Sequence, residues 1–187
     1  MHSTIWFIAG YSKSGKTTVG DLLTEITKGN HTTFAKAVKD DVARITGIER
    51  ILFETQEGKA ALYVDGKTGR QLLIDHAAIE KERTDNPAYW AVKVGHEIAA
   101  APDTIDWVLS DWRYNAEIDY IRARFPERRV ITIRIERPRI IPSSSPSEHE
   151  LDDTTFDYNV LNSGSLLYLG AQIQNIVWES GQHSATS

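Results

Sequence analysis

The chain of 187 residues contains no cysteine and no long apolar run. The absence of cysteine excludes disulfide bonds and thiolate metal sites, and it is typical of proteins from a reducing compartment, so we expect a cytoplasmic location. No apolar run approaches the roughly 18 residues that a membrane-spanning helix needs. The N-terminus enters an apolar segment without a basic flank or a small-residue cleavage site, so we expect no signal peptide.

The chain also lacks a surplus of positive charge. It has 21 Lys and Arg against 26 Asp and Glu, a formal net charge of −5. Dedicated nucleic-acid binders usually carry a basic surplus, so the charge argues against that class without excluding a local basic groove. Seven arginines crowd into one stretch, where they are either solvated ends of helices and strands or, in part, phosphate-facing groups. They are Arg122, Arg124, Arg128, Arg129, Arg134, Arg137 and Arg139.

Apolar segments with strand character alternate with segments of helical periodicity along most of the chain. This alternation predicts one α/β domain over residues 1–187, with three layers (α/β/α) around a mostly parallel sheet of about five strands. The predicted strands are residues 4–9, 31–34, 105–110, 129–135 and 158–161. The predicted helices are residues 17–27, 35–45, 70–83, 87–100, 116–125 and 165–178, with an Asn86 cap and Pro87 opening the fourth of them.

Three stretches depart from this alternation. Residues 48–66 have little periodicity and predict irregular structure. Residues 138–155 contain three prolines, a run of serines and several acidic residues, which predicts a loop or lid inserted into the domain. The tail from residue 181 to residue 187 is expected to fray.

The segment from Gly10 to Thr17 matches the pattern GxxxxGK[ST] at every fixed position. It follows an apolar strand and opens an amphipathic helix, which is the context that a phosphate-binding loop requires. Its glycines permit a tight curl with inward-pointing N–H groups, while Lys16 reaches the β- and γ-phosphates and Thr17 offers a hydroxyl to Mg²⁺. We therefore predict an ATP site at Gly10, Ser12, Lys13, Ser14, Gly15, Lys16, Thr17 and Thr18.

Asp111 follows a strongly apolar predicted strand, at the sheet edge where ligands of open α/β sheets collect. A carboxylate at this edge can hold the water shell of Mg²⁺ beside the phosphate loop. The alternative is a helix cap or a surface turn, because a helix is predicted shortly after Asp111.

Other features favour transfer of a phosphoryl group over signalling or motor function. The chain is small, it has no Asn-Lys-x-Asp sequence for reading guanine, and it carries arginines at helix and strand ends. Transfer between phosphates depends on positioning and on neutralising charge, so guanidinium groups suit it. The candidates are Arg70, Arg83, Arg113 and Arg137.

The order of these landmarks resembles the bacteriophage deoxynucleoside monophosphate kinases and, more loosely, the animal-type phosphomevalonate kinases, both within the nucleoside monophosphate kinase fold. The resemblance runs from Ile5 to Ile176 and would imply a viral source and a host cytoplasm. Besides the phosphate loop, it is carried by the segments at residues 34–39, 70–73, 83–90, 110–117, 137–148 and 162–165.

The resemblance implies a P-loop kinase fold and a set of residue roles. Lys13, Lys16 and Thr17 would serve ATP and Mg²⁺, and Asp111 the metal shell. Asn162 would lie near the adenine, and Arg137 would neutralise the transferring group from the lid. The acceptor phosphate would face Lys39, Arg70, Arg83 and Arg113. Partners would be small nucleotides, the protein being a monomer or a homodimer.

Several alternatives stay open. The acceptor could instead be a phosphorylated isoprenoid precursor, or a hydroxymethylated pyrimidine that is free or within DNA. In another class, the chain would be a nucleotide-binding switch or ATPase module, for which Gln56 is the one candidate water-positioning residue. His149, in the acidic lid, is expected to be merely solvated.

Overall fold

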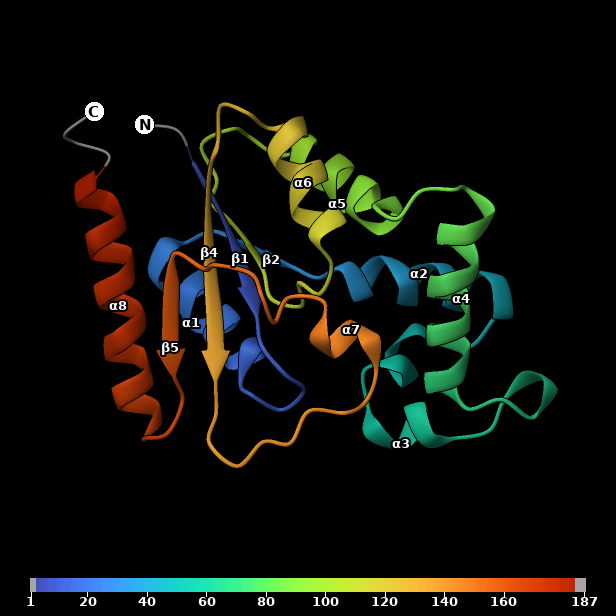
Figure 1. Cartoon of the computed structure of the whole chain (residues 1–187). Coiled ribbons are helices and arrows are strands. Elements are labelled where there is room, and N and C mark those ends of the chain that lie inside the picture. The colour runs from blue at the N-terminus through green and yellow to red at the C-terminus, as the bar shows by residue number, and fades with distance from the viewer. Residues whose placement is uncertain (1–2, 184–187) are drawn as a thin grey trace.

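The computed structural model describes residues 3–183 and shows a parallel sheet between two helical layers (Figure 1). The sheet has five strands in the order β2-β3-β1-β4-β5, and every pair is parallel. The prediction of a three-layer fold with about five strands is confirmed. The strands are β1 (Thr4–Ala9), β2 (Asn30–Thr32), β3 (Trp107–Leu109), β4 (Arg129–Glu136) and β5 (Tyr158–Leu161).

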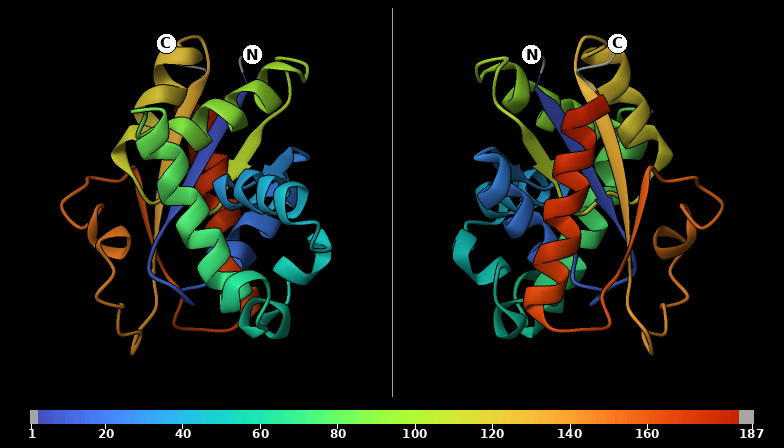
Figure 2. Two further views of the ribbon diagram at one scale, coloured as in Figure 1. Left: turned by 90° about the vertical axis from the view of Figure 1, so that its right-hand side faces the viewer. Right: turned by 90° about the vertical axis from the view of Figure 1, so that its left-hand side faces the viewer.

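The helices divide between the two faces of the sheet (Figures 1 and 2). One face is covered by α1 (Lys16–Thr27) and α8 (Leu166–His183), which pack against each other. The other face carries α2 (Phe34–Thr46), α5 (Tyr89–Ala99) and α6 (Asn115–Arg124), with α4 (Gly69–Arg83) outside α2. Among residues 3–183, no helix is both long enough and apolar enough to cross a membrane.

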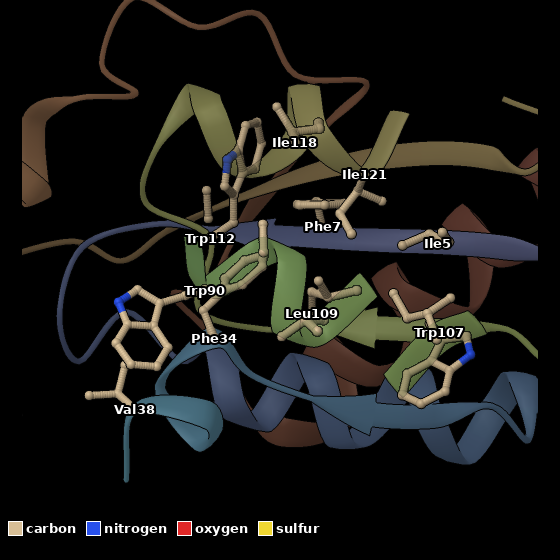
Figure 3. Close-up of a cluster of buried hydrophobic side chains, with 14 of the residues drawn as sticks. Ile5, Phe7, Phe34, Val38, Trp90, Trp107, Leu109, Trp112, Ile118 and Ile121 are labelled. Atoms are coloured by element: carbon tan, nitrogen blue, oxygen red, sulfur yellow. The ribbon is translucent and has the colours of Figure 1, made fainter. Parts of the chain in front are cut away.

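Each face has its own hydrophobic core, because residues alternate between the two faces along a strand. Toward α1 and α8 the strands present side chains such as Trp6, Ile8 and Val160. Toward α2, α5 and α6 they present Phe7 and Leu109, which lie among the aromatic side chains shown in Figure 3. Trp112 packs edge-on against Phe7 in this second core, with ring centroids 5.5 Å apart. The aromatic packing fixes the turn after β3, where candidate site residues lie.

Most predicted elements are found, with boundaries shifted by a few residues. The second strand ends at Thr32 and not at Phe34, because Thr33 caps α2 by accepting the N–H of Lys36. The third strand, β3, spans three residues and is shorter than the predicted strand at residues 105–110. The helix predicted to begin at Pro87 begins at Tyr89, because Asn86 accepts the N–H of Ala88 in a turn before the helix. α8 continues to His183, so the predicted fraying from residue 181 is wrong for residues 181–183. The rest of the predicted tail, 184–187, lies outside the described residues.

The stretch predicted to be irregular contains three short helices. They are η1 (Arg50–Phe53), α3 (Gln56–Ala60) and η2 (Val64–Gly66). Each is too short for a helical period to show in the sequence. The lid stretch, residues 138–155, is extended or irregular except for the four-residue α7 (Pro146–His149).

The sheet topology creates a crevice between the carboxyl ends of β1 and β3. From β1 the chain continues to β2 at one edge of the sheet, whereas from β3 it continues to β4, on the opposite side of β1. Ligands of open α/β sheets bind at such a switch point. The lid and the segment from α2 to α4 lie on opposite sides of this edge (Figure 2).

Candidate functional site

The loop between β1 and α1, residues 10–15, is curled in a way that requires glycine at two positions. Gly10 has φ +142° and Gly15 has φ +108°, values that other residues rarely adopt. A Cβ on Gly10 would lie 2.4 Å from the carbonyl oxygen of Ile135, and one on Gly15 would lie 2.4 Å from Nδ2 of Asn162. Both backbone conformation and close packing therefore require glycine at these two fixed positions of the sequence pattern.

The curl leaves backbone N–H groups available at the mouth of α1. The first hydrogen bond of this helix runs from the N–H of Val19 to the carbonyl oxygen of Gly15. Within residues 3–183 the N–H groups of Lys16, Thr17 and Thr18 have no acceptor. Unpaired N–H groups and the positive end of the helix dipole together form an anion site.

Lys16 lies folded back over this loop. Its Nζ donates to the carbonyl oxygens of Gly10 (2.6 Å) and Tyr11 (2.9 Å). Burial, with help from the charge of Arg113, lowers the pKa of Lys16 from 10.5 to about 8. The ammonium is thus a poorly solvated charge, which an arriving polyanion would stabilise.

Asp111, directly after β3, is bound to the start of another helix. Its Oδ1 accepts the N–H of Phe34 and its Oδ2 accepts the N–H of Ala35, each at 2.8 Å. Burial raises the pKa of Asp111 above its ordinary value, against the lowering effect of these two N–H groups. Asp111 therefore caps the start of α2 and not the helix that follows it. Its role in the water shell of Mg²⁺ stays a prediction.

The groups at this edge suit Mg²⁺ only in part. Thr17 is exposed on the first turn of α1, so its hydroxyl is accessible for a metal bond. Since both oxygens of Asp111 already accept N–H groups, this carboxylate fits the water shell of a metal better than direct ligation. In the described part of the chain, no group of three or more His, Asp or Glu is arranged for a metal. The remaining ligands would therefore have to come from phosphates and water.

Arg113 approaches the phosphate loop from the turn after β3. Its Nη1 donates to Oε1 of Glu148, on α7 of the lid. The other oxygen of Glu148, Oε2, accepts the N–H of Ser12 at 2.8 Å. A lid carboxylate therefore lies between the loop backbone and a guanidinium group.

Two further predicted residues contact the loop from the same carboxyl edge of the sheet, on its β4 and β5 side. Arg137, after β4, donates from Nη1 to the carbonyl oxygen of Lys13 at 3.4 Å. Asn162, after β5, donates from Nδ2 to the carbonyl oxygen of Ser14 at 2.8 Å. Asn162 thus supports the loop directly, and its predicted position near adenine stays a prediction. The hydroxyl of Ser14 is buried without a partner in the described residues.

Two of the residues predicted to face an acceptor, Lys39 and Arg70, lie on the helices α2 and α4. Lys39 pairs with Glu54 at 2.6 Å, and its charge opposes the rise in the pKa of Asp111 that burial causes. Arg70, on α4, is exposed and donates to Oε1 of Gln56 at 3.3 Å. Gln56 is thus engaged with an arginine on the side of the crevice away from the lid.

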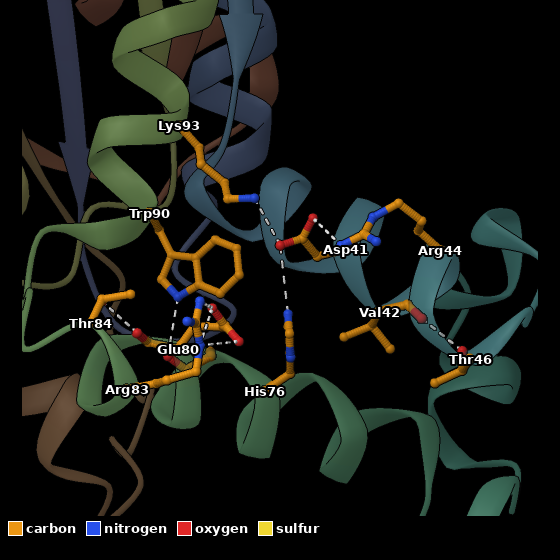
Figure 4. A network of polar contacts seen from close by, with 11 residues as sticks. Asp41, Val42, Arg44, Thr46, His76, Glu80, Arg83, Thr84, Trp90 and Lys93 are labelled. Carbon is orange, nitrogen blue, oxygen red and sulfur yellow. Dashed lines mark hydrogen bonds and ion pairs between the residues drawn. The ribbon is translucent and has the colours of Figure 1, made fainter.

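Arg83 is in a different setting, at the far end of α4. It pairs with Glu80 one turn earlier at 2.6 Å, and its side chain is 62% exposed (Figure 4). No contact among residues 3–183 links Arg83 to the phosphate loop, so its acceptor role stays a prediction. Trp90, close by, is 2% exposed and donates to the carbonyl oxygen of Ala77, so it is a core residue.

A second lid carboxylate, Asp152, was not predicted from the sequence. Its Oδ1 accepts the hydroxyl of Tyr11 (2.8 Å) and Nη2 of Arg134 (2.9 Å), and its Oδ2 contacts Nδ1 of His149 (2.8 Å). Hydrogen bonds from His149 and Arg134 lower the pKa of Asp152 to about 2. His149 is exposed, as expected, but it is tied to this acid.

Comparison with known proteins supports the same architecture. No protein-family model matches the chain, and no curated protein sequence does. Dephospho-CoA kinase from Campylobacter jejuni aligns with a TM-score of 0.53 at 12% identity, over 96% of this chain and 98% of that one. The chain has the P-loop kinase fold.

Two further solved structures align with this chain over nearly their whole length. TT1252 from Thermus thermophilus aligns with a TM-score of 0.50 at 16% identity, over 96% of this chain and 98% of that one. Shikimate kinase from Aquifex aeolicus aligns with a TM-score of 0.48 at 14% identity, over 98% and 99%. Identities this low establish the fold alone. The predicted P-loop kinase fold is confirmed, and the acceptor has to be argued from the site.

Proposed function

We propose that the chain is an ATP-dependent kinase that transfers the γ-phosphoryl group to a (deoxy)nucleoside monophosphate. The observation that carries the proposal is the convergence of three cations from separate segments on one loop of free N–H groups. Lys16 lies over the loop, and Arg137, at the start of the lid, donates to the carbonyl oxygen of Lys13. Arg113 binds Glu148, whose other oxygen accepts the N–H of Ser12, and the charge of Arg113 helps to lower the pKa of Lys16. A site of this kind neutralises the charge of a phosphoryl group in transit.

In the proposed reaction the free N–H groups and Lys16 hold the β- and γ-phosphates, and Lys13 lies exposed at the loop edge. Thr17 would hold Mg²⁺, with Asp111 on its water shell, and the metal would supply further charge neutralisation. Asn162 would place the adenine end of ATP through the loop after β5.

Lys39, Arg70 and Arg113 would bind the acceptor phosphate, because they share neighbours. The charges of Arg113 and Lys39 both act on the pKa of Asp111, and those of Lys39 and Arg70 both act on the pKa of Lys59. An oxygen of that phosphate attacks the γ-phosphorus while the bond to the bridging oxygen of ADP breaks. Since the attacking oxygen is already ionised, no general base and no covalent enzyme intermediate are needed. The lid would exclude water and limit hydrolysis.

A substrate panel tests the proposal. ADP formation is measured with ATP and each deoxynucleoside and ribonucleoside monophosphate, with phosphomevalonate, and with duplex DNA that contains 5-hydroxymethylpyrimidine. We expect ADP formation to depend on a nucleoside monophosphate and to be lost in Lys16→Met. Dependence on another acceptor would replace the proposed acceptor class. ADP formation at the same rate without acceptor would favour the switch or ATPase module.

A further inference from the structure

The lid places a negative charge in a site built for anions. Both oxygens of Glu148 are used: one accepts the N–H of Ser12 and the other accepts the guanidinium of Arg113. The side chain of Glu148 is 4% exposed, although it belongs to a four-residue helix in an otherwise irregular segment. A carboxylate is rarely buried to this degree without a specific partner.

The surroundings of Glu148 keep it ionised. Burial by itself would raise its pKa, but the N–H of Ser12 and the guanidinium of Arg113 outweigh burial and hold the pKa below the ordinary value. The charge of Lys16 acts in the same direction. Glu148 therefore interacts with groups that a ligand phosphate would use.

A phosphate group and this carboxylate compete for the same donors. A phosphate oxygen that binds Arg113 beside the loop would meet the negative charge of Glu148 within a few ångströms, since the same guanidinium group already bonds that carboxylate. Like charges at such a separation repel each other. Glu148 must therefore move away, or a phosphate cannot bind fully.

The rest of the lid has few attachments that would resist such a movement. Leu151 and Phe156 anchor its end in the core, and Asp152 bonds to Tyr11 and Arg134. In the preceding part, residues 138–147, the hydrogen bonds are mostly internal to the lid. Release of Glu148 would leave α7 held by His149, which bonds to Asp152 and lies against Tyr11. The start of α7 could then move while the base of the lid stays fixed.

We propose that Glu148 is an internal phosphate mimic, whose carboxylate occupies the anion position between Ser12 and Arg113 until a ligand phosphate displaces it. The lid is then latched shut in the nucleotide-free protein, and ligand binding releases the latch. The inference rests on the proposed function in one respect, namely that a phosphate-bearing ligand enters this loop.

The test compares Glu148→Gln with Glu150→Gln, a matched loss of one negative charge at an exposed position of the same lid. Glutamine keeps an oxygen for the N–H of Ser12, and thermal denaturation verifies that both variants fold. Calorimetry measures the Kd of inorganic pyrophosphate and of a non-hydrolysable ATP analogue with Mg²⁺. We expect Glu148→Gln to bind both about tenfold more tightly than the unsubstituted protein, because a competing charge is gone. Glu150→Gln should bind them with unchanged affinity.

Unchanged or weaker binding by Glu148→Gln would overturn the latch. It would indicate instead that Glu148 positions Arg113 for the ligand. Equal tightening by Glu150→Gln would also overturn it, because the effect would then come from the net charge of the lid. If no acceptor is phosphorylated by the unsubstituted protein while Glu148→Gln still binds pyrophosphate more tightly, the proposed function fails and the latch stands.

Discussion

Replacing Lys16 by methionine removes the ammonium of the phosphate loop and keeps an unbranched side chain of similar length. We expect two opposite effects: the ligand-free fold becomes more stable, while turnover falls. Both follow from the charge on Lys16, which is held mainly by burial at a pKa of about 8 instead of 10.5. Each tenfold change in an acid dissociation constant corresponds to about 1.4 kcal/mol. Holding the charged form therefore costs the fold about 3 kcal/mol at pH 7.

Lys16→Met removes this cost, but part of the resulting gain in stability is lost because the carbonyl oxygens of Gly10 and Tyr11 lose the donor Nζ. Each lost hydrogen bond costs up to about 1 kcal/mol, less where water replaces it. The net expectation is an increase of about 1–3 kcal/mol in the free energy of unfolding. For a chain of this length that corresponds to a Tm higher by about 2–10 °C. Turnover should fall by about 10²- to 10³-fold, as for other groups that stabilise developing charge.

The pH dependence separates this cause from simple repacking. Because the folded-state pKa of Lys16 lies below the unfolded value, the cost is fully present below pH 8 and declines as the pH rises toward 10.5. About 2 kcal/mol of it should disappear between pH 7 and pH 9.5. The stability gap between Lys16→Met and the unsubstituted protein should shrink accordingly.

Urea unfolding and thermal denaturation at the two pH values provide the measurement. Lys13→Met is the control, because Lys13 is an exposed lysine of the same loop, and its stability should change by less than about 0.5 kcal/mol. A Lys16→Met variant that is no more stable at pH 7, or a gap that stays constant at pH 9.5, would refute the reasoning about the buried charge. Near-normal turnover would refute the assignment of Lys16 to the phosphates.

Three further predictions concern the loop, the acceptor side and a buried acid. Gly15→Ala should destabilise the protein by about 1–3 kcal/mol and weaken nucleotide binding in calorimetry. The added Cβ would lie 2.4 Å from Nδ2 of Asn162, on a residue whose φ is +108°. The control is Gly47→Ala, where φ is +72° but the space is open, and it should leave nucleotide binding unchanged. Arg113→Ala should lower kcat/KM for the acceptor by about 10- to 100-fold through the loss of a charge-assisted hydrogen bond, and equal kinetics would contradict its role. Burial raises the pKa of Glu117 to about 7, and its Oε2 accepts two N–H groups that the oxygen of glutamine could also accept. Glu117→Gln should therefore raise the free energy of unfolding by up to about 3 kcal/mol at pH 8 and much less at pH 5. The reason is that the cost of burying the carboxylate in the folded state arises only at pH values where the carboxyl would ionise in the unfolded chain. The same gain at both pH values would argue against a buried, ionisable Glu117.

The phosphate loop and the alternation of strands and helices can be predicted from local sequence patterns alone. A phosphate loop is a local structure: the glycines at positions 10 and 15, the lysine and the threonine act within one turn, so their spacing along the chain is enough to identify them. Strand and helix periods are also short-range, and β1 and β5 have the predicted bounds. The short helices of residues 50–66 were not predicted, because a helix of fewer than two turns shows no detectable period in the sequence.

Which distant residues meet at that loop depends on the folded arrangement of the whole chain. Ser12 and Glu148 are 136 positions apart, and Tyr11 and Asp152 are 141 apart, yet each pair is joined by a hydrogen bond. The same holds for Asp111, whose carboxylate caps a helix 76 positions earlier in the chain. Such contacts depend on the order of strands in the sheet and on the path of the lid, which no local pattern encodes. The sequence therefore predicts where an anion binds, whereas the fold determines which charges surround it.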